Sequence, residues 1–153
     1  MAIVDLKDLP PIGPLIGIDP GTKTLGIAVS DALRLIASPA EIIPRGKKFA
    51  PTLRRLEELI EERGAVGLVI GLPLNMDGTE GPRAQASRAL ANNITKSKNI
   101  PIALFDERLS SAQAERGMIE ADLSRAPRAE LIDASAAAII LQTALGRIAN
   151  TQT

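Results

Sequence analysis

The chain has 153 residues, of which 45% are hydrophobic and 24% charged, a composition that suits one folded domain. It contains no cysteine, histidine, tryptophan or tyrosine, which excludes disulfide frameworks, Cys/His zinc sites, thiol nucleophiles and Ser-His-Asp triads. Eighteen Lys and Arg residues balance eighteen Asp and Glu residues, so any surface for nucleic acid has to be local. Catalysis would have to use carboxylates, lysine, hydroxyls or a metal held by oxygen ligands, which favours magnesium or manganese.

Residues 1–13 carry turn-breaking residues and little periodicity, so we expect a flexible lead-in before a single domain over residues 14–150. The first residues include acids and prolines, where a secretory signal would have a basic region and a long apolar run. No apolar stretch approaches membrane-spanning length. These features predict a cytoplasmic protein without a membrane partner.

The first half of the domain should supply three strands. Leu15 to Asp19 is an apolar run, Pro20-Gly21 is typical of a turn, and residues 24–31 alternate in polarity, a pattern that predicts a β-hairpin. A further strand is expected over residues 33–43.

The second half alternates helices with strands. An amphipathic helix is expected over 49–63, and an apolar run over 66–70 that ends at Gly71 indicates a buried parallel strand. The remaining expected elements are a helix over 82–98, a strand over 100–105, a helix over 110–122 and a last helix from Pro127. The order predicts a three-layer α/β domain with a five-stranded mixed sheet flanked by helices.

Acids lie where the parallel strands of this sheet should end, at one edge. Asp19 ends the first strand, although an Asp before Pro-Gly is also a common turn starter. Asp106 and Glu107 end the fifth strand, and because neighbouring side chains point to opposite faces, we expect one of them to join Asp19. We favour Glu107 for its reach and keep Asp106 as the alternative. Asp133 borders the small apolar face of the last helix, or is a boundary residue paired with a nearby arginine.

Three converging carboxylates would repel one another unless one or two divalent cations lay between them. A loaded site would attract a phosphodiester, and a metal pair could activate water and stabilise the leaving oxygen. Phosphodiester hydrolysis is therefore the leading chemistry for this edge.

Two basic segments suit a polyanion, or are simply solvated helix faces. They are Arg45, Lys47, Lys48, Arg54 and Arg55 in the first segment, and Arg83, Arg88, Lys96 and Lys98 in the second. Phe49 and Phe105 are both expected in the core, which would leave no aromatic platform for bases. Residues 71–81 form either an ordered surface loop or a contact for substrate phosphate.

Four ordered motifs resemble the YqgF/RuvX family, whose members carry the names pre-16S rRNA nuclease and Holliday-junction resolvase-like protein. The motifs are GIDPGTKTLGIAVSD (17–31), VIGLPLNMDGTEGPRAQA (69–86), FDERLSSAQAE (105–115) and IEADLSRAPRAELIDASAAAIILQ (119–142). The resemblance spans nearly the whole chain from about residue 15 to 148 and implies an RNase H-like fold. It also implies that Asp19, Glu107 and Asp133 are catalytic acids that bind Mg²⁺ or Mn²⁺.

The same resemblance makes Lys23 and Arg108 candidates for phosphate contact, and we add Arg83, Arg125 and Arg128 as substrate-binding candidates. This chain has Ala134 where the family commonly has lysine, and its basic run is thinned to Arg125 and Arg128. The departures suggest a weaker grip on nucleic acid and leave the three acids intact.

The expected function is a metal-dependent nuclease that matures the 5′ end of pre-16S rRNA. A Holliday-junction resolvase-like endonuclease on branched DNA would use the same chemistry, and it would need a symmetric homodimer where RNA processing needs only a monomer. A non-catalytic, ribosome-associated binding module is a further alternative. The D-x-G-T turn also resembles the phosphate-binding turn of actin-like ATPases, which close two domains over a nucleotide.

Overall fold

The computed structural model describes residues 3–110 and 126–151, with side chains over 3–110 and 135–150. Its framework is one six-stranded mixed sheet with the strand order β1-β6-β5-β2-β3-β4. The strands are β1 (Ile3–Val4), β2 (Leu15–Pro20), β3 (Thr24–Ser30), β4 (Ala37–Pro44), β5 (Gly67–Leu72) and β6 (Ile102–Asp106). Strand β3 runs antiparallel to both of its neighbours, and the other pairings are parallel. The α/β class and the mixed sheet predicted from the sequence are confirmed.

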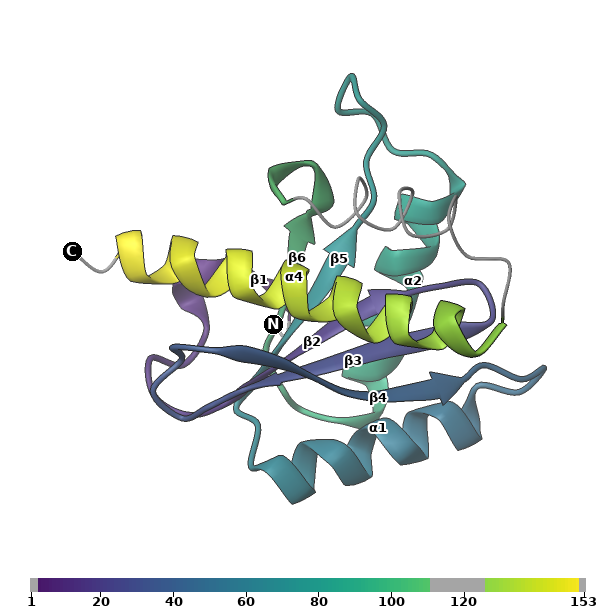
Figure 1. Cartoon of the computed structure of the whole chain (residues 1–153), viewed down its shortest axis with the longest axis horizontal. Helices are drawn as coiled ribbons and strands as arrows, with labels where there is room; N and C mark the ends of the chain where they lie inside the picture. The colour runs from purple at the N-terminus through teal and green to yellow at the C-terminus, as the bar shows by residue number, and fades with distance from the viewer. Residues whose placement is uncertain (1–2, 111–125, 152–153) are drawn as a thin grey trace.

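Helices cover both faces of the sheet and make three layers (Figure 1). Helices α1 (Ala50–Arg63) and α2 (Pro82–Ser97) lie on one face, and α4 (Ala126–Thr151) crosses the other. Two short 3₁₀ turns, η1 (Leu6–Asp8) and η2 (Glu107–Leu109), complete the described elements. The expected helix over 110–122 falls almost entirely outside the described residues.

Strand alternation divides the core into two clusters. Ile16, Ile18 and Ile70 face α1 and α2, whereas Leu15 and Val69 face α4. Helix α4 packs closely on the sheet at Gly17. A Cβ built on Gly17 would lie 2.8 Å from Leu141 Cβ and 3.2 Å from the Ala137 carbonyl oxygen. The small-residue face of the last helix, noted in the sequence, therefore fits a glycine in the sheet.

The sheet has six strands instead of the expected five, because part of the N-terminal segment joins it. Ile3–Val4 pairs in parallel with β6, and Leu9 is buried in the α4-side core. The side chain of Arg34 adds hydrogen bonds to the Pro10 and Gly13 carbonyl oxygens. Over residues 3–13 the chain is therefore docked on the domain, in contrast to the expected flexible lead-in.

Strand β4 also begins later than its hydrophobic pattern suggests. The Asp31 side chain accepts hydrogen bonds from the Leu35 and Ile36 amides at 2.8 and 3.0 Å, which holds residues 31–36 in a tight connection. Arg34 there has a positive φ of 60°. The apolar residues Leu33, Leu35 and Ile36 are thus exposed in the turn and do not extend the strand.

No helix within the described ranges is long and apolar enough to cross a membrane. The longest, α4, packs the apolar residues of its described C-terminal part, such as Ile140 and Leu141, onto the sheet.

Candidate active site

Two carboxylates are buried at the carboxyl edge of the parallel strands. Asp19 lies near the end of β2 and is 2% exposed, and Glu107 follows β6 and is fully buried. Strand β5 lies between β2 and β6, and its register opposes Ile18 to Ile70. One step further along that register, Asp19 falls opposite Gly71.

Gly71 makes room for the Glu107 side chain. A Cβ built on Gly71 would lie 3.2 Å from both Glu107 Cγ and Cδ, and 3.0 Å from Ile140 Cδ1. The Glu107 carboxyl group is therefore set over the end of β5, on the α4 face to which the Asp19 position belongs. The fold thus brings two of the three sequence-predicted acids to the same edge of the sheet, on the face covered by α4. Sequence reasoning did not single out Gly71, although a glycine that ends a buried strand is a sign of close approach.

Asp106 takes a different role from its neighbour. Its carboxylate accepts hydrogen bonds from the Arg108 side chain, the closest at 2.8 Å, and from the Arg108 amide at 2.9 Å. The Arg108 guanidinium holds the pKa of the Asp106 carboxyl below its usual value. Asp106 thus caps η2 and fixes Arg108, while Glu107 turns into the buried edge.

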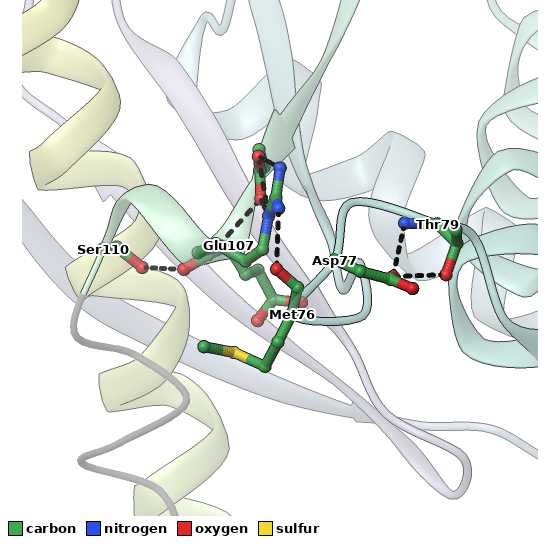
Figure 2. A network of polar contacts seen from close by, with 7 residues as sticks. Met76, Asp77, Thr79, Glu107 and Ser110 are labelled. Atoms are coloured by element: carbon green, nitrogen blue, oxygen red, sulfur yellow. Dashed lines mark hydrogen bonds and ion pairs between the residues drawn. The ribbon is translucent and has the colours of Figure 1, made fainter.

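Arg108 reaches from η2 to the loop over residues 73–81. Its Nη1 atom donates to the Met76 carbonyl oxygen at 3.3 Å, and in Figure 2 the loop that carries Met76, Asp77 and Thr79 lies beside the turn that carries Glu107. The loop is ordered from within, since the Asp77 carboxylate accepts from the Thr79 amide and hydroxyl at 3.0 and 2.6 Å. Arg108 therefore links η2 to the loop over residues 73–81 through hydrogen bonds.

The other residues assigned to the site from the sequence belong to its C-terminal part. Asp133 and Arg128 lie where only the backbone of α4 is described, and Arg125 lies outside the described residues. Among the side chains that the structure does describe, no three acids form a group that could hold a metal ion. The described site is a pair of buried carboxylates on an edge along which α4 passes.

Basic groups line the turn that follows Asp19. Lys23 is exposed in this turn, and Arg83 on α2 lines a pocket of about 330 Å³ together with Pro20–Thr22 and Arg45. Arg45 fastens the turn, because its side chain donates to the Gly21 carbonyl and its amide donates to the Lys23 carbonyl at 2.8 Å. Partial burial lowers the pKa of the Arg45 guanidinium from its usual value.

Several of the other cations that the sequence suggested for a polyanion are engaged with acids. Arg55 contacts Glu41 at 2.7 Å and also pairs with Glu58 and Glu62, and Arg88 contacts Glu80 at 2.7 Å. Lys98 lies 3.4 Å from Glu61. These three side chains form surface ion pairs, as the solvated-face interpretation expects.

Comparison with known proteins identifies the family to which the chain belongs. The family model described as "RuvX: Holliday junction resolvase" matches residues 13–147. The chain belongs to the RuvX family. It is 56% identical over 142 residues to a Rhodobacter capsulatus protein and 51% identical over 156 residues to a Phenylobacterium zucineum protein, both named "Putative pre-16S rRNA nuclease". These alignments cover 93% of this chain and 89% of the first relative, and 98% and 99% for the second.

Solved structures share the fold of this RuvX family member at much lower identity. The RuvC protein of T. thermophilus, solved in complex with a Holliday junction substrate, superposes with a TM-score of 0.53 at 19% identity, covering 91% of this chain and 97% of RuvC. The yeast mitochondrial Holliday junction resolvase Ydc2 gives 0.50 at 13% identity, with 95% and 85% covered. The RNase H-like fold that the resemblance implies is thereby confirmed.

Proposed function

We propose that this protein is a metal-dependent nuclease that hydrolyses phosphodiester bonds during maturation of the 5′ end of pre-16S rRNA in the cytoplasm. The observation that carries the proposal is the pair of buried carboxylates, Asp19 and Glu107, on the face of the sheet covered by α4. Two carboxylates at one edge of a sheet offer a hard divalent cation oxygen ligands from two different strands. The substrate in this proposal, pre-16S rRNA, is taken from the names of the RuvX relatives.

The donor set fits a hard divalent cation. Both buried side chains offer oxygen ligands, and the chain has no histidine or cysteine to favour zinc or copper. Asp19 and Glu107 would hold Mg²⁺ or Mn²⁺, and we assign Asp133 as the third ligand. When bound, such a cation lowers the pKa of water and neutralises charge that develops on a phosphodiester.

The chain's own residues set the geometry of the reaction. Strand β2 and the turn at Pro20–Thr22 fix Asp19, and Gly71 lets the Glu107 carboxyl approach the end of β5. The Asp106–Arg108 pair holds η2 against the 73–81 loop, so Glu107 is supported from outside the site. We assign Lys23 and Arg83, together with Arg125 and Arg128 from the last motif, to the substrate phosphates, and Arg108 to the edge of that surface.

The test is cleavage of an RNA that carries the precursor 5′ end of 16S rRNA, with Mg²⁺ or Mn²⁺. We expect the wild-type protein to cut it and Asp19→Asn and Glu107→Gln to lose at least a hundredfold in rate, since each change removes a ligand charge. Asp8→Asn, an equivalent change at an exposed acid in η1, should cut normally. Equal rates for Asp19→Asn and wild type would refute the proposal.

Cleavage of branched DNA is the second candidate, favoured by the description of the matching family model. Symmetric junction cutting needs two sites related by a twofold axis, so it requires a homodimer. A four-way junction cut only by dimeric protein would support this function. A monomer that cuts the precursor RNA and not the junction would favour rRNA processing. Binding of either substrate without cleavage, under all metal conditions, would instead indicate a non-catalytic module.

A further inference from the structure

A continuous groove runs between the β4–α1 loop and helix α2. Two pockets, of about 330 and 300 Å³, share Arg45, Gly46 and Ala86 and so join end to end. One end is formed by the turn at residues 20–22 and the other by Asn93. We call this surface the α2 groove. It lies on the face of the sheet covered by α1 and α2, and it opens at the turn directly after Asp19.

The charge of the α2 groove is one-sided. Arg45, Lys47 and Arg83 line it, and Lys48 lines an adjoining pocket of about 550 Å³ that also includes Lys47. No Asp or Glu lines any of the three pockets. Within the described part of the chain these four cations form no ion pair with an acid. Arg55, Arg88 and Lys98, by contrast, each pair with a glutamate. A neutral protein has thus concentrated uncompensated positive charge in one groove, which is the footprint of a polyanion site.

The far half of the groove is apolar and includes an aromatic ring. Phe49 is half-buried and lines the groove beside Ala89 and Leu90, so the ring is not wholly enclosed in the core as the sequence led us to expect. Asn93, at the same end, offers amide donors and acceptors. A basic track beside an aromatic face is the combination that binds single-stranded nucleic acid, with bases stacked and phosphates paired.

We infer that the α2 groove binds single-stranded nucleic acid, with phosphates against Arg45, Lys47 and Arg83 and a base against Phe49, and that it leads the strand to the turn after Asp19. The inference rests on the proposed nuclease function for its direction, because the Asp19 end is the reacting end. The groove itself is defined independently of the carboxylates. The ligand is single-stranded because a duplex keeps its bases stacked inside and leaves no base for Phe49.

The experiment measures binding without turnover. Fluorescence anisotropy of a labelled twelve-nucleotide single-stranded RNA, in a chelator, gives the dissociation constant across a salt series. The double variant Lys47→Gln/Arg83→Gln should reduce the salt slope by about 1.4 and weaken binding about 25-fold at 0.1 M salt, for two lost phosphate contacts. Phe49→Leu, which keeps an apolar side chain against the core, should weaken binding about fivefold and leave the slope unchanged.

The chain offers a matched control, one arginine and one lysine on the helices beside the groove. Arg54 and Lys96 are exposed on α1 and α2 and line none of the pockets around the groove. Arg54→Gln/Lys96→Gln removes the same net charge and should change the dissociation constant less than twofold. Equal losses of RNA affinity in the two double variants would overturn the inference. It would also be overturned by a preference for an RNA duplex whose binding Phe49→Leu and the groove variant leave unchanged.

Position is tested by cross-linking, since the chain has no native thiol. Ala86→Cys places a thiol in the groove and Asn92→Cys places one elsewhere on α2. An RNA that carries an activated mixed disulfide should exchange with the first thiol, releasing its small-thiol leaving group, and not with the second. The reverse preference would overturn the inference. Groove-dependent binding by a protein that never cleaves would leave this inference standing and refute the proposed nuclease. Cleavage without groove dependence would do the opposite.

Discussion

The absence of a side chain at Gly71 leaves room for the Glu107 carboxyl group. A methyl group at residue 71 would crowd Glu107 Cγ and Cδ at 3.2 Å and Ile140 Cδ1 at 3.0 Å, so either the acid or α4 must shift. Overpacking of this kind costs about 1–3 kcal/mol in stability. A shift of a few tenths of an ångström would also disturb the proposed chemistry, because a productive site holds its groups to within about 0.5 Å.

We therefore predict that Gly71→Ala folds but cleaves more slowly than wild type, with the melting temperature lowered by several degrees. Gly146→Ala is the control, since a Cβ there meets nothing within 4 Å. Alanine is the better helix former by about 1 kcal/mol, so this variant should melt slightly higher and cleave normally. Full activity in Gly71→Ala would show that Glu107 does not need its observed position.

Asp106 gives a pH-dependent prediction at the same scale. The hydrogen bonds from Arg108 hold the pKa of Asp106 below 3.8 in the folded protein, while the unfolded chain has the ordinary value. A carboxyl group whose pKa is lowered by folding adds stability above its unfolded pKa and loses it as the pH falls through the folded pKa.

Asp106→Asn should accordingly melt lower than wild type at pH 7, and the difference should shrink steadily as the pH falls from about 5 towards 3. Thermal unfolding of both proteins across this pH range is the measurement. A difference in melting temperature that stays constant with pH would mean that the Arg108 contact contributes nothing through charge.

The N-terminal segment is the element that sequence patterns predicted least well. Strand β1 has two residues and pairs with β6, about a hundred positions along the chain, so no local periodicity could reveal it. By contrast, α1, α2, β5 and β6 were predicted within about three residues, because each carries its own hydrophobic period and turn signals. Local patterns predict elements whose burial is set by their own sequence, and miss those whose burial depends on a distant partner.

The site follows the same division. Asp19 and the Asp106–Glu107 pair stand out in the sequence because they end apolar runs. Strand alternation indicates that one of the pair joins Asp19, and Glu107 is favoured for its reach. The contact of Arg108 with the Met76 carbonyl oxygen and that of Arg45 with Gly21 were not predictable, since each joins residues more than twenty positions apart. Both arginines look like phosphate ligands in the sequence, and both also hold backbone in place.

Docking of the N-terminal segment can be tested at Leu9, which is 4% exposed in the α4-side core. Leu9→Ala should lower the free energy of unfolding by about 2–4 kcal/mol, as buried leucines do. Ile12→Ala, three residues on and 80% exposed, should change it by less than about 0.5 kcal/mol. Urea denaturation of the two variants measures both values, and a neutral Leu9→Ala would mean that the segment is detached in solution.

At the scale of the whole molecule, a cation held by Asp19 and Glu107 would make stability depend on the cation concentration. A ligand that binds only the folded state stabilises that state by mass action. At a hundred times its dissociation constant, the gain is about 2.7 kcal/mol. For a chain of this size that corresponds to a rise of roughly 5–10 °C in melting temperature.

We predict such a rise in melting temperature for the wild-type protein when Mn²⁺ or Mg²⁺ is titrated in. An excess of chelator should abolish the rise. Asp19→Asn, which lacks one of the proposed ligands, should respond to neither cation. Scanning calorimetry across the titration measures the response of each protein. Asp8→Asn, the change at an exposed acid, should keep the full rise. If wild type and Asp19→Asn rise together, the cations bind elsewhere than at these two carboxylates.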